Sequence, residues 1–415
     1  MAYKRRNVSV IIDRINEQRR FIQIVIGPRQ TGKTTAVSQA LEGFEHPFLS
    51  VMATKGESTA DWLRAQWYQA RRLAGSGPAL LVIDEVQFVP NWSSVVKTLW
   101  DEDALAGLDL RVLLTGSSAT LIQEGLDESL AGRFELVEST HWTYPECAEA
   151  FGYSLDEYLF FGGYPGAAPL RHDRRRWLRY MNASVIEPSI ANDAMRLSEV
   201  RNPELMRRLF SVGAPHSGQE ISYRKLLGQL DDRGNTATIA HYLKLLGDAG
   251  IMSGLQKYDP KLLRSKASSP RLLVHDTAIM TAAFGRKRDA LLTDPDLRGR
   301  LVETAVGAYL INLSYSGDVE VFWWRDGNLE VDFVVTCEDA VCAIEVKSGR
   351  VKPTRGMSEF IVNNPDARSL VVGSRECPLE DFLSGRIDLL GGCKARAHNP
   401  KVVGSNPAPA TKINA

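Results

Sequence analysis

Eight residues near the N-terminus have the types and spacing of a phosphate-binding loop. Residues 27–34 read GPRQTGKT, which fits the pattern G-x-x-x-x-G-K-[ST] between an apolar run and a helix-like stretch. Glycines let the backbone wrap closely around a phosphate, and N–H groups at a helix start bind it. Lys33 would contact the β- and γ-phosphates, and the Thr34 hydroxyl would bind Mg²⁺. The predicted nucleotide-binding residues here are Gly27, Pro28, Arg29, Gln30, Thr31, Gly32, Lys33, Thr34 and Thr35.

Two adjacent acids end a second apolar run. ALLVIDEVQ at 79–87 is typical of a buried strand that ends in Asp84 and Glu85. Asp84 would bind nucleotide-associated Mg²⁺ together with Thr34, and Glu85 would orient or deprotonate the attacking water. Acids at a strand end are otherwise merely solvated. Their position one strand after GPRQTGKT favours a site for ATP or GTP with Mg²⁺.

A third apolar run, RVLLTGSSA at 111–119, also ends in polar residues. Thr115, Ser117 and Ser118 would lie where a γ-phosphate is sensed, and Ser117 is the predicted catalytic member. A helix cap is the other explanation for these serines, and the two roles are compatible.

The elements that must position these residues are a series of strands and helices. FIQIVI, PFLSVM, ALLVID and RVLLTG alternate with amphipathic stretches from Phe21 onward. Such a βαβ series predicts an α/β fold with a parallel sheet covered by helices on both faces.

The middle of the chain is helix-like and locally basic. A Gly-Gly-Tyr-Pro-Gly break at 162–166 precedes an arginine cluster, RHDRRRWLRY at 171–180. Two helices and a strand then follow, beginning at ISYRKLLGQL, and this order resembles a winged helix. Residues 201–271 contain twelve Lys/Arg and six Asp/Glu. The two helices, with Arg224, Lys225, His241 and Lys244, would therefore contact DNA, or the module is a lid or a protein-docking surface.

Four residues near the C-terminus could form a second metal site. Glu303 on a helix, Asp332 in LEVDFVV, and Glu345 and Lys347 in AIEVK have the E…D…ExK spacing of the PD-(D/E)xK nuclease fold. Asp332 and Glu345 would bind Mg²⁺, and Lys347 would stabilise the attacking water or the developing charge. The alternative is a solvated strand face or an ion pair between Glu345 and Lys347. Residues 296–392 contain ten Lys/Arg and sixteen Asp/Glu, which favours a scaffold over constitutive cutting.

Taken together, these motifs resemble bacterial and archaeal AAA+-type P-loop ATPases that carry a C-terminal domain of unknown function with a nuclease-like core. GPRQTGKT, VIDEVQ, LTGSSA, LAGRFE, EYLFFGGYPGA, LVETAVGAYL, EVDFVV and AIEVKSG occur here in the order found in that family. The resemblance covers nearly the whole chain. It implies ATP rather than GTP, and ATP hydrolysis with Mg²⁺.

The same resemblance assigns a role to Arg133 in LAGRFE. It looks like the arginine that such ATPases direct at the γ-phosphate, from the same subunit or from a neighbour in a homo-oligomer. The alternative is a surface arginine paired with Glu135. After LAGRFE the chain has STHWTYPECAEA instead of the apolar segment that is usual in the family, so this junction would pack differently.

These expectations divide the 415 residues into four parts. They are a P-loop ATPase domain (1–140), a helical and winged-helix region (141–275), a small α/β nuclease-like domain (276–392) and a disordered tail (393–415). Fifty Lys/Arg balance fifty Asp/Glu, which argues against a protein that coats nucleic acid, and no apolar run is long enough to span a membrane. A cytoplasmic location is the default expectation.

Three hypotheses about function remain open from the sequence. The first is an ATPase switch or motor coupled to nucleic acid, with or without cutting it. The second is an ATP-dependent regulatory module that binds a protein partner. The third is a small-molecule kinase, although the sequence shows no motif for an acceptor pocket.

Overall fold

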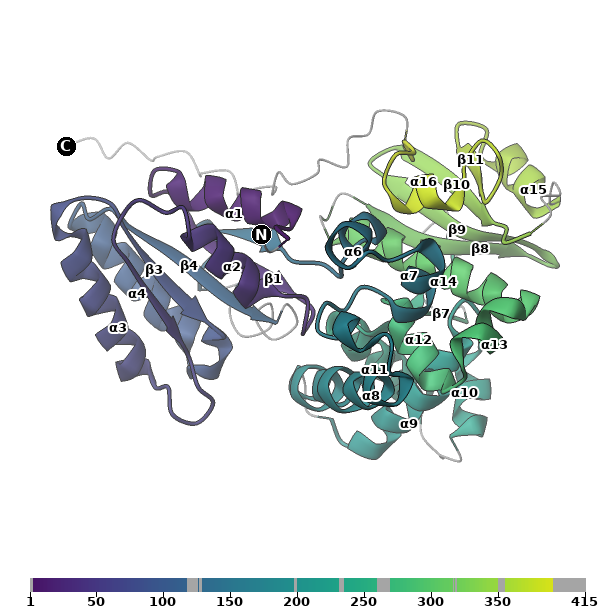
Figure 1. The fold of residues 1–415 in the computed structure, drawn as a ribbon, viewed down its shortest axis with the longest axis horizontal. Helices are drawn as coiled ribbons and strands as arrows, with labels where there is room; N and C mark the ends of the chain where they lie inside the picture. Colours follow the sequence, from purple (N-terminus) through teal and green to yellow (C-terminus); the bar gives the residue numbers. More distant parts are fainter. Residues whose placement is uncertain are drawn as a thin grey trace, which may run out of the picture.

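The structure is a computed structural model that describes most of the chain (Figure 1). The described residues are 3–117, 126, 129–197, 200–230, 235–259, 269–315, 317, 319–349 and 355–390. The expected tail at 393–415 and the expected γ-phosphate contact at Ser118 lie outside these ranges. Among the described residues, no helix is both long enough and apolar enough to cross a membrane.

The N-terminal part is built on a five-stranded parallel sheet with the order β2-β3-β4-β1-β5. Alternate residues of a strand point to opposite faces: Leu80 and Val82 pack under one helical layer, while Leu81 and Ile83 pack under the other. This confirms the predicted α/β fold. The strands are β1 (Ile22–Gly27), β2 (Phe48–Met52), β3 (Ala79–Asp84), β4 (Leu110–Ser117) and β5 (Phe134–Glu138).

Helices cover both faces of this sheet, as Figure 1 shows. The layer with Val8, Ile11 and Ala36 comes from α1 and α2, and the layer with Leu63 and Trp67 comes from α3 and α4. The bounds are α1 (Arg6–Asn16), α2 (Lys33–Leu41), α3 (Ala60–Leu73), η1 (Ala74–Ser76), η2 (Val86–Phe88) and α4 (Trp92–Leu105).

The middle part is mainly helical and contains two antiparallel strands, β6 and β7. Helices α10 and α11 precede these strands, and the side chain of Asn235 caps α11 by accepting from the Ala237 N–H at 3.0 Å. The elements are α6 (Tyr144–Phe151), α7 (Leu155–Phe161), η4 (Ala168–Leu170), α8 (Arg174–Tyr180), η5 (Met181–Ile186), η6 (Ser189–Asp193), η7 (Ala194–Arg196), α9 (Pro203–Gly213), η8 (Ala214–His216), α10 (Tyr223–Gln229), α11 (Thr236–Asp248), β6 (Met252–Leu255), β7 (Arg271–Val274), α12 (Thr277–Phe284) and α13 (Arg288–Thr293).

The C-terminal part is a four-stranded sheet of order β11-β10-β9-β8 between two helices. Phe333 and Ile344 face the layer that contains α14, while Val334 and Ala343 pack against Phe360 of α15. The elements are α14 (Pro295–Ser314), β8 (Glu320–Asp326), β9 (Leu329–Cys337), β10 (Ala340–Val346), α15 (Arg355–Asn363), β11 (Arg368–Val372) and α16 (Leu379–Leu383).

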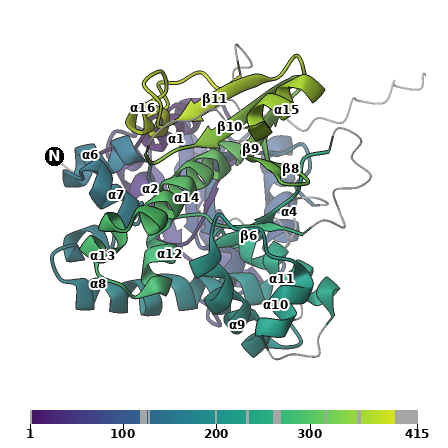
Figure 2. The same ribbon diagram turned by 90° about the vertical axis from the view of Figure 1, so that its right-hand side faces the viewer.

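The middle and C-terminal parts share one hydrophobic core, which runs from Trp142 to Leu390. The sheet of the N-terminal part has separate cores on its two faces. Figure 2 shows α12 and α14 beside each other within the shared body. A core therefore continues across the expected boundary between residues 275 and 276, because helices on both sides of it bury their apolar faces against each other.

Candidate active site

The predicted phosphate loop connects the end of β1 to the start of α2. Gly32 has a φ of 89°, which a residue with a side chain rarely adopts. Gly27 lies so close to the neighbouring chain that an added Cβ would be 2.0 Å from the carbonyl oxygen of Ser139. The two invariant glycines of the motif are thus required here by conformation and by space, respectively.

The start of α2 offers donors for an anion. Its N-cap residue is Gly32, which has no side chain to accept from the first N–H groups of the helix. Lys33 is buried, and its Nζ donates to the carbonyl oxygens of Gly27 at 3.0 Å and Pro28 at 2.9 Å. Burial lowers the pKa of Lys33, while Glu85 opposes that shift. These donors fit a bound phosphate.

Asp84 is held at the end of β3 by two hydroxyl groups. Thr34 Oγ1 donates to Asp84 Oδ2 at 2.8 Å, and Thr115 Oγ1 donates to Asp84 Oδ1. The structure thus brings together a hydroxyl and a carboxylate from the two predicted motifs. Oxygen ligands of this kind fit Mg²⁺.

Glu85 occupies a backbone conformation that is uncommon for its type. Its φ is 55°, in the left-handed region. The Glu85 N–H donates to Thr115 Oγ1 at 3.2 Å, and the Glu85 carboxylate accepts from the Gln87 side chain. The turn after β3 is therefore held at its backbone by Thr115, and the Glu85 carboxylate is held by Gln87.

Ser117 lies on the strand next to the phosphate loop. The pairing of β4 with β1 places Ser117 opposite Gly27, and the serine is 6% exposed. Of the predicted polar group at the end of β4, Thr115 contacts Asp84, while Ser117 lies beside the first glycine of the loop.

The middle part of the chain reaches the phosphate loop through an ion pair. Arg29 Nε and a terminal guanidinium nitrogen donate to the two carboxylate oxygens of Asp193 at 2.9 and 2.8 Å. Asp193 is 2% exposed, and its hydrogen bond raises the pKa of Arg29. Asp193 ends η6, the second of two π-helical turns, and such turns often occur at functional sites.

Further contacts hold the rest of the loop. Trp142 Nε1 donates to the Thr31 carbonyl at 2.9 Å, and the Tyr180 hydroxyl lies 3.4 Å from Gln30 Oε1. Pro28 packs so close to Gly250 that a Cβ there would lie 2.7 Å from its Cγ. The sequence missed this surface, because each partner is more than a hundred residues away and belongs to no recognised motif.

Arg5 links the N-terminal segment to the phosphate loop and to α6. Its side chain is buried and donates to both oxygens of Glu146 at 2.9 and 3.0 Å, and to the Thr31 carbonyl at 3.2 Å. A buried guanidinium needs such partners. Arg5 therefore fastens the phosphate loop to α6.

Arg133 lies near the start of β1, at the opposite end of this strand from the phosphate loop. Its carbonyl accepts from the N–H of Ile22, at the start of β1, whereas the phosphate loop follows the end of β1. Its guanidinium binds Asp101 at 2.8 and 3.0 Å. The structure thus does not bring Arg133 to the site of its own chain. The alternative pairing of Arg133 with Glu135 is not found, because Glu135 binds Gln23 and Arg14 instead.

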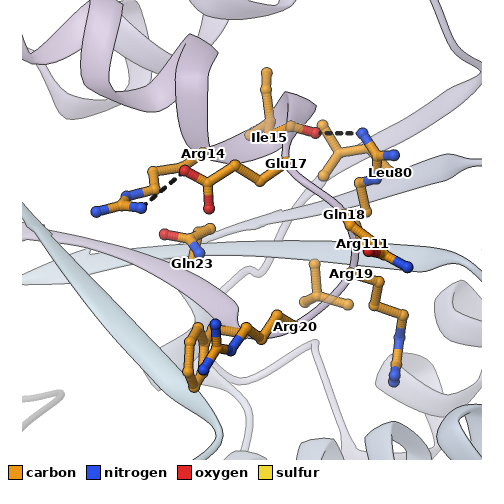
Figure 3. Close-up of a pocket in the computed structure, with 11 residues that line it drawn as sticks. Arg14, Ile15, Glu17, Gln18, Arg19, Arg20, Gln23, Leu80 and Arg111 are labelled. Carbon is orange, nitrogen blue, oxygen red and sulfur yellow. Dashed lines mark hydrogen bonds and ion pairs between the residues drawn. The ribbon is translucent and has the colours of Figure 1, made fainter. Parts of the chain in front are cut away.

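A small pocket lies near the strand ends where Arg133 is found (Figure 3). Its arginines serve the fold: Arg19 stacks on Trp100 at 3.6 Å and donates to two carbonyl groups, and Arg111 donates to the Ile15 carbonyl at 2.9 Å. They fix the end of α1 to the sheet. The pocket is therefore distinct from the nucleotide site. It is lined by Arg14, Ile15, Glu17, Gln18, Arg19, Arg20, Phe21, Gln23, Leu80, Arg111 and Val112.

The second predicted site gathers around a buried arginine that the sequence did not single out. Arg271, in β7, donates to Glu303 Oε1 at 2.5 Å and to Asp332 Oδ1 at 3.3 Å. Burial raises the pKa of both acids, and Arg271 opposes that shift. Arg271 thus supplies a positive charge between Glu303 and Asp332.

The remaining members of that site are also engaged. Asp332 Oδ2 accepts from the Val346 N–H at 2.8 Å, and Lys347 Nζ donates to Glu345 Oε1 at 2.6 Å. Within the described ranges, no group of three or more His, Cys, Asp or Glu side chains is placed to hold a metal ion. This arrangement does not fit the Mg²⁺ that the sequence predicted at Asp332 and Glu345, because Arg271 already pairs with Asp332 and Lys347 already pairs with Glu345.

Three family models match successive parts of the chain. Residues 19–148 match an AAA domain, residues 152–290 a domain of unknown function (DUF8612), and residues 298–382 a second domain of unknown function (DUF4143). The first match contains all the nucleotide-site residues described above.

Uncharacterized proteins of two bacteria are similar over most of the chain. One of Mycobacterium tuberculosis is 27% identical over 371 residues, covering 87% of this chain and 78% of its own. One of Haemophilus influenzae is 21% identical over 347 residues, covering 79% of this chain and 82% of its own.

Two solved structures illustrate the similarity, which is low in both cases. The Walker-type ATPase PABY2304 of Pyrococcus abyssi has a TM-score of 0.46 at 14% identity, covering 68% of this chain and 96% of its own. The ORC1 protein of Aeropyrum pernix in complex with DNA has a TM-score of 0.31 at 11% identity, covering 70% and 94%. The AAA domain match and the geometry of the phosphate loop together support an ATP-binding, AAA-type P-loop ATPase domain at residues 19–148.

Proposed function

We propose that the protein is a cytoplasmic ATP-hydrolysing switch or motor whose activity is coupled to nucleic acid through the parts that follow the ATPase domain. The observation that carries this proposal is the ion pair between Arg29 of the phosphate loop and the buried Asp193 of the middle part. A movement of Arg29 would shift or break its contact with Asp193, and a movement of Asp193 would do the same to Arg29. Nucleotide state and the conformation of the middle part are thereby linked.

The residues of the site divide the work of hydrolysis. Lys33 would leave the carbonyls of Gly27 and Pro28 and bind phosphate oxygens, while Thr34 and Asp84 would hold Mg²⁺. When bound, Mg²⁺ neutralises charge that develops on the phosphates. Glu85 would orient the attacking water and accept its proton.

The middle part supplies a module of the kind that contacts DNA. Helices α10 and α11 are followed by the antiparallel β6 and β7, which is the element order of a winged helix. Arg224, Lys225, His241 and Lys244 are exposed on the two helices. Their charge and exposure support phosphate contact.

A second candidate function is an ATP-dependent regulatory module whose C-terminal part binds a protein and does no chemistry. The contact of Arg271 with Glu303 and Asp332 favours an inactive nuclease-like domain within either function. The two functions differ only in the macromolecule that the protein engages.

The rate of ATP hydrolysis in the presence of DNA, RNA or neither separates the two functions. We expect nucleic acid to raise the rate roughly fivefold or more, the lower end of ordinary coupling between sites. Lys33→Ala protein provides the background rate. A wild-type rate that is the same in all three conditions would refute coupling to nucleic acid and leave the protein-binding alternative.

The position of Arg133 restricts its predicted role to the ATP of a neighbouring copy. Arg133→Ala and Lys33→Ala proteins should each be inactive, and mixing them should restore part of the ATPase rate through interfaces with one intact arginine and one intact lysine. Replacing Arg133 removes no contact of the phosphate loop in the same chain, but it does remove the ion pair with Asp101. Circular dichroism therefore checks that the variant folds. An Arg133→Ala protein with the wild-type rate would remove this residue from catalysis.

A further inference from the structure

Helix α8 presents a row of arginines to solvent. Arg174, Arg175, Arg176 and Arg179 are exposed, whereas Trp177 is 1% exposed. The centroid of a Trp177 ring lies 5.5 Å from the ring centroid of Phe160 and 5.5 Å from that of Phe161. The helix is thus anchored through its single buried aromatic side chain, and its other face is basic.

A second basic segment, which begins 111 residues after Arg174, lies against this helix. The Arg174 guanidinium donates to the carbonyls of Gly285 and Arg286, so residues 285–288 lie at the start of α8. Arg286 and Lys287 are exposed. We call α8 together with residues 285–288 the α8 surface; Figure 2 shows α8 and α13, which begins at Arg288, near each other.

The α8 surface has more basic side chains than acidic ones. The α8 surface with its flanking residues, 171–180 and 285–289, contains eight Lys/Arg and two Asp. The nearby acids Asp156 and Glu157 already pair with Arg298 and Arg171. Among the described residues, no acidic side chain forms an ion pair with the exposed arginines of α8. Such an excess attracts a polyanion.

The composition of the surface favours nucleic acid over a lipid membrane. Arginine binds phosphate oxygens with two parallel hydrogen bonds, and it provides seven of the eight cations. A helix that lies on a membrane needs an exposed apolar face, but the aromatic side chain of α8 is buried under the helix. The α8 surface offers charge without an apolar face to insert.

The α8 surface is joined directly to the phosphate loop. The last residue of α8, Tyr180, has its hydroxyl 3.4 Å from Gln30 Oε1, and the chain then continues through η5 and η6 to Asp193, which binds Arg29. The helix from Arg174 to Tyr180 spans only about 9 Å. Binding of a ligand to the arginines of α8 would therefore act on a short segment that contacts the phosphate loop at Tyr180 and at Asp193.

From this arrangement we propose that the α8 surface binds the phosphate backbone of nucleic acid and transmits its occupation to the phosphate loop through Tyr180 and Asp193. The inference rests on the proposed coupling to nucleic acid, and it identifies where that coupling begins. It assigns to α8 the phosphate contact that acts on the loop, and it treats the winged-helix surface on α10 and α11 as a separate surface for nucleic acid.

The direct test is binding of a short fluorescein-labelled DNA duplex at low salt, followed by anisotropy. Arg175→Glu with Arg176→Glu should weaken binding by about tenfold or more and reduce its salt dependence, because phosphate contacts are lost. Arg64→Glu with Arg72→Glu on α3 changes the net charge equally and should retain most of the affinity. Arg224→Glu with Lys225→Glu on α10 tests the rival surface.

Tyr180→Phe tests the transmission. It should keep the DNA affinity of the wild type and lose most of the DNA-stimulated ATP hydrolysis, because only the contact with Gln30 is removed. Wild-type stimulation in this variant would overturn the link through Tyr180.

The remaining outcomes distinguish this inference from the proposed function. Loss of binding in the α10 variant but not in the α8 variant would overturn the α8 surface and leave nucleic-acid coupling intact. A wild-type protein that binds vesicles of anionic phospholipid but neither DNA nor RNA would overturn both. In each case the basal rate of ATP hydrolysis is measured separately and reports on the ATPase domain alone.

Discussion

Glu85→Gln protein should bind ATP with nearly wild-type affinity and hydrolyse it about 10²- to 10⁴-fold more slowly, the usual loss when a general base is removed. The amide keeps the size of the carboxylate and its contact with Gln87, but it cannot accept a proton from water. Affinity is measured by calorimetry with Mg²⁺·ATP, and turnover by phosphate release.

Lys33→Ala protein provides the contrasting result. Lys33 is buried in the loop, and its contacts would pass to phosphate oxygens in both the ground state and the transition state. Loss of one charge-assisted interaction should weaken ATP binding roughly tenfold to a hundredfold. If Glu85→Gln protein turned over ATP at the wild-type rate, another group would have to activate the water.

Arg271→Met should destabilise the protein by about 3–5 kcal/mol, the usual cost of removing one partner from a buried ionic cluster. The variant leaves Glu303 and Asp332 facing each other without the guanidinium, which is 5% exposed in the wild type. Chemical denaturation measures the change. Arg325→Met is the matched control: this arginine pairs with Glu220 and Glu330 at the surface, so its loss should cost less than about 1 kcal/mol.

A divalent cation tests whether Arg271 stands where a metal would otherwise bind. Mn²⁺ should raise the thermal stability of Arg271→Met protein, because two acids without their arginine attract a hard cation and binding stabilises the folded state. It should leave the wild type unchanged. Stabilisation of the wild type by Mn²⁺, with DNA cleavage that disappears in Asp332→Ala protein, would show instead a working nuclease site.

The sequence alone predicted the candidate nucleotide site, and it determined the type of sheet that carries this site. The phosphate loop, Asp84 and Glu85 follow consecutive motifs, and their chemistry depends on local geometry: a glycine turn, a helix start and a strand end. Alternating apolar runs predicted the parallel sheet for the same reason, since side-chain periodicity is a local property. The AAA domain match at residues 19–148 supports that part of the interpretation.

Tertiary structure decided which of the remaining candidates meet. Arg133 and the phosphate loop both adjoin β1, but at its opposite ends, and only the strand pairing reveals this. Arg271 belongs to no motif, yet it lies between Glu303 and Asp332 and takes the role expected for a metal. Asp193 reaches Arg29 across 164 positions of sequence. Long-range ion pairs of this kind depend on how whole elements pack, and a pattern read along one chain carries no record of that packing.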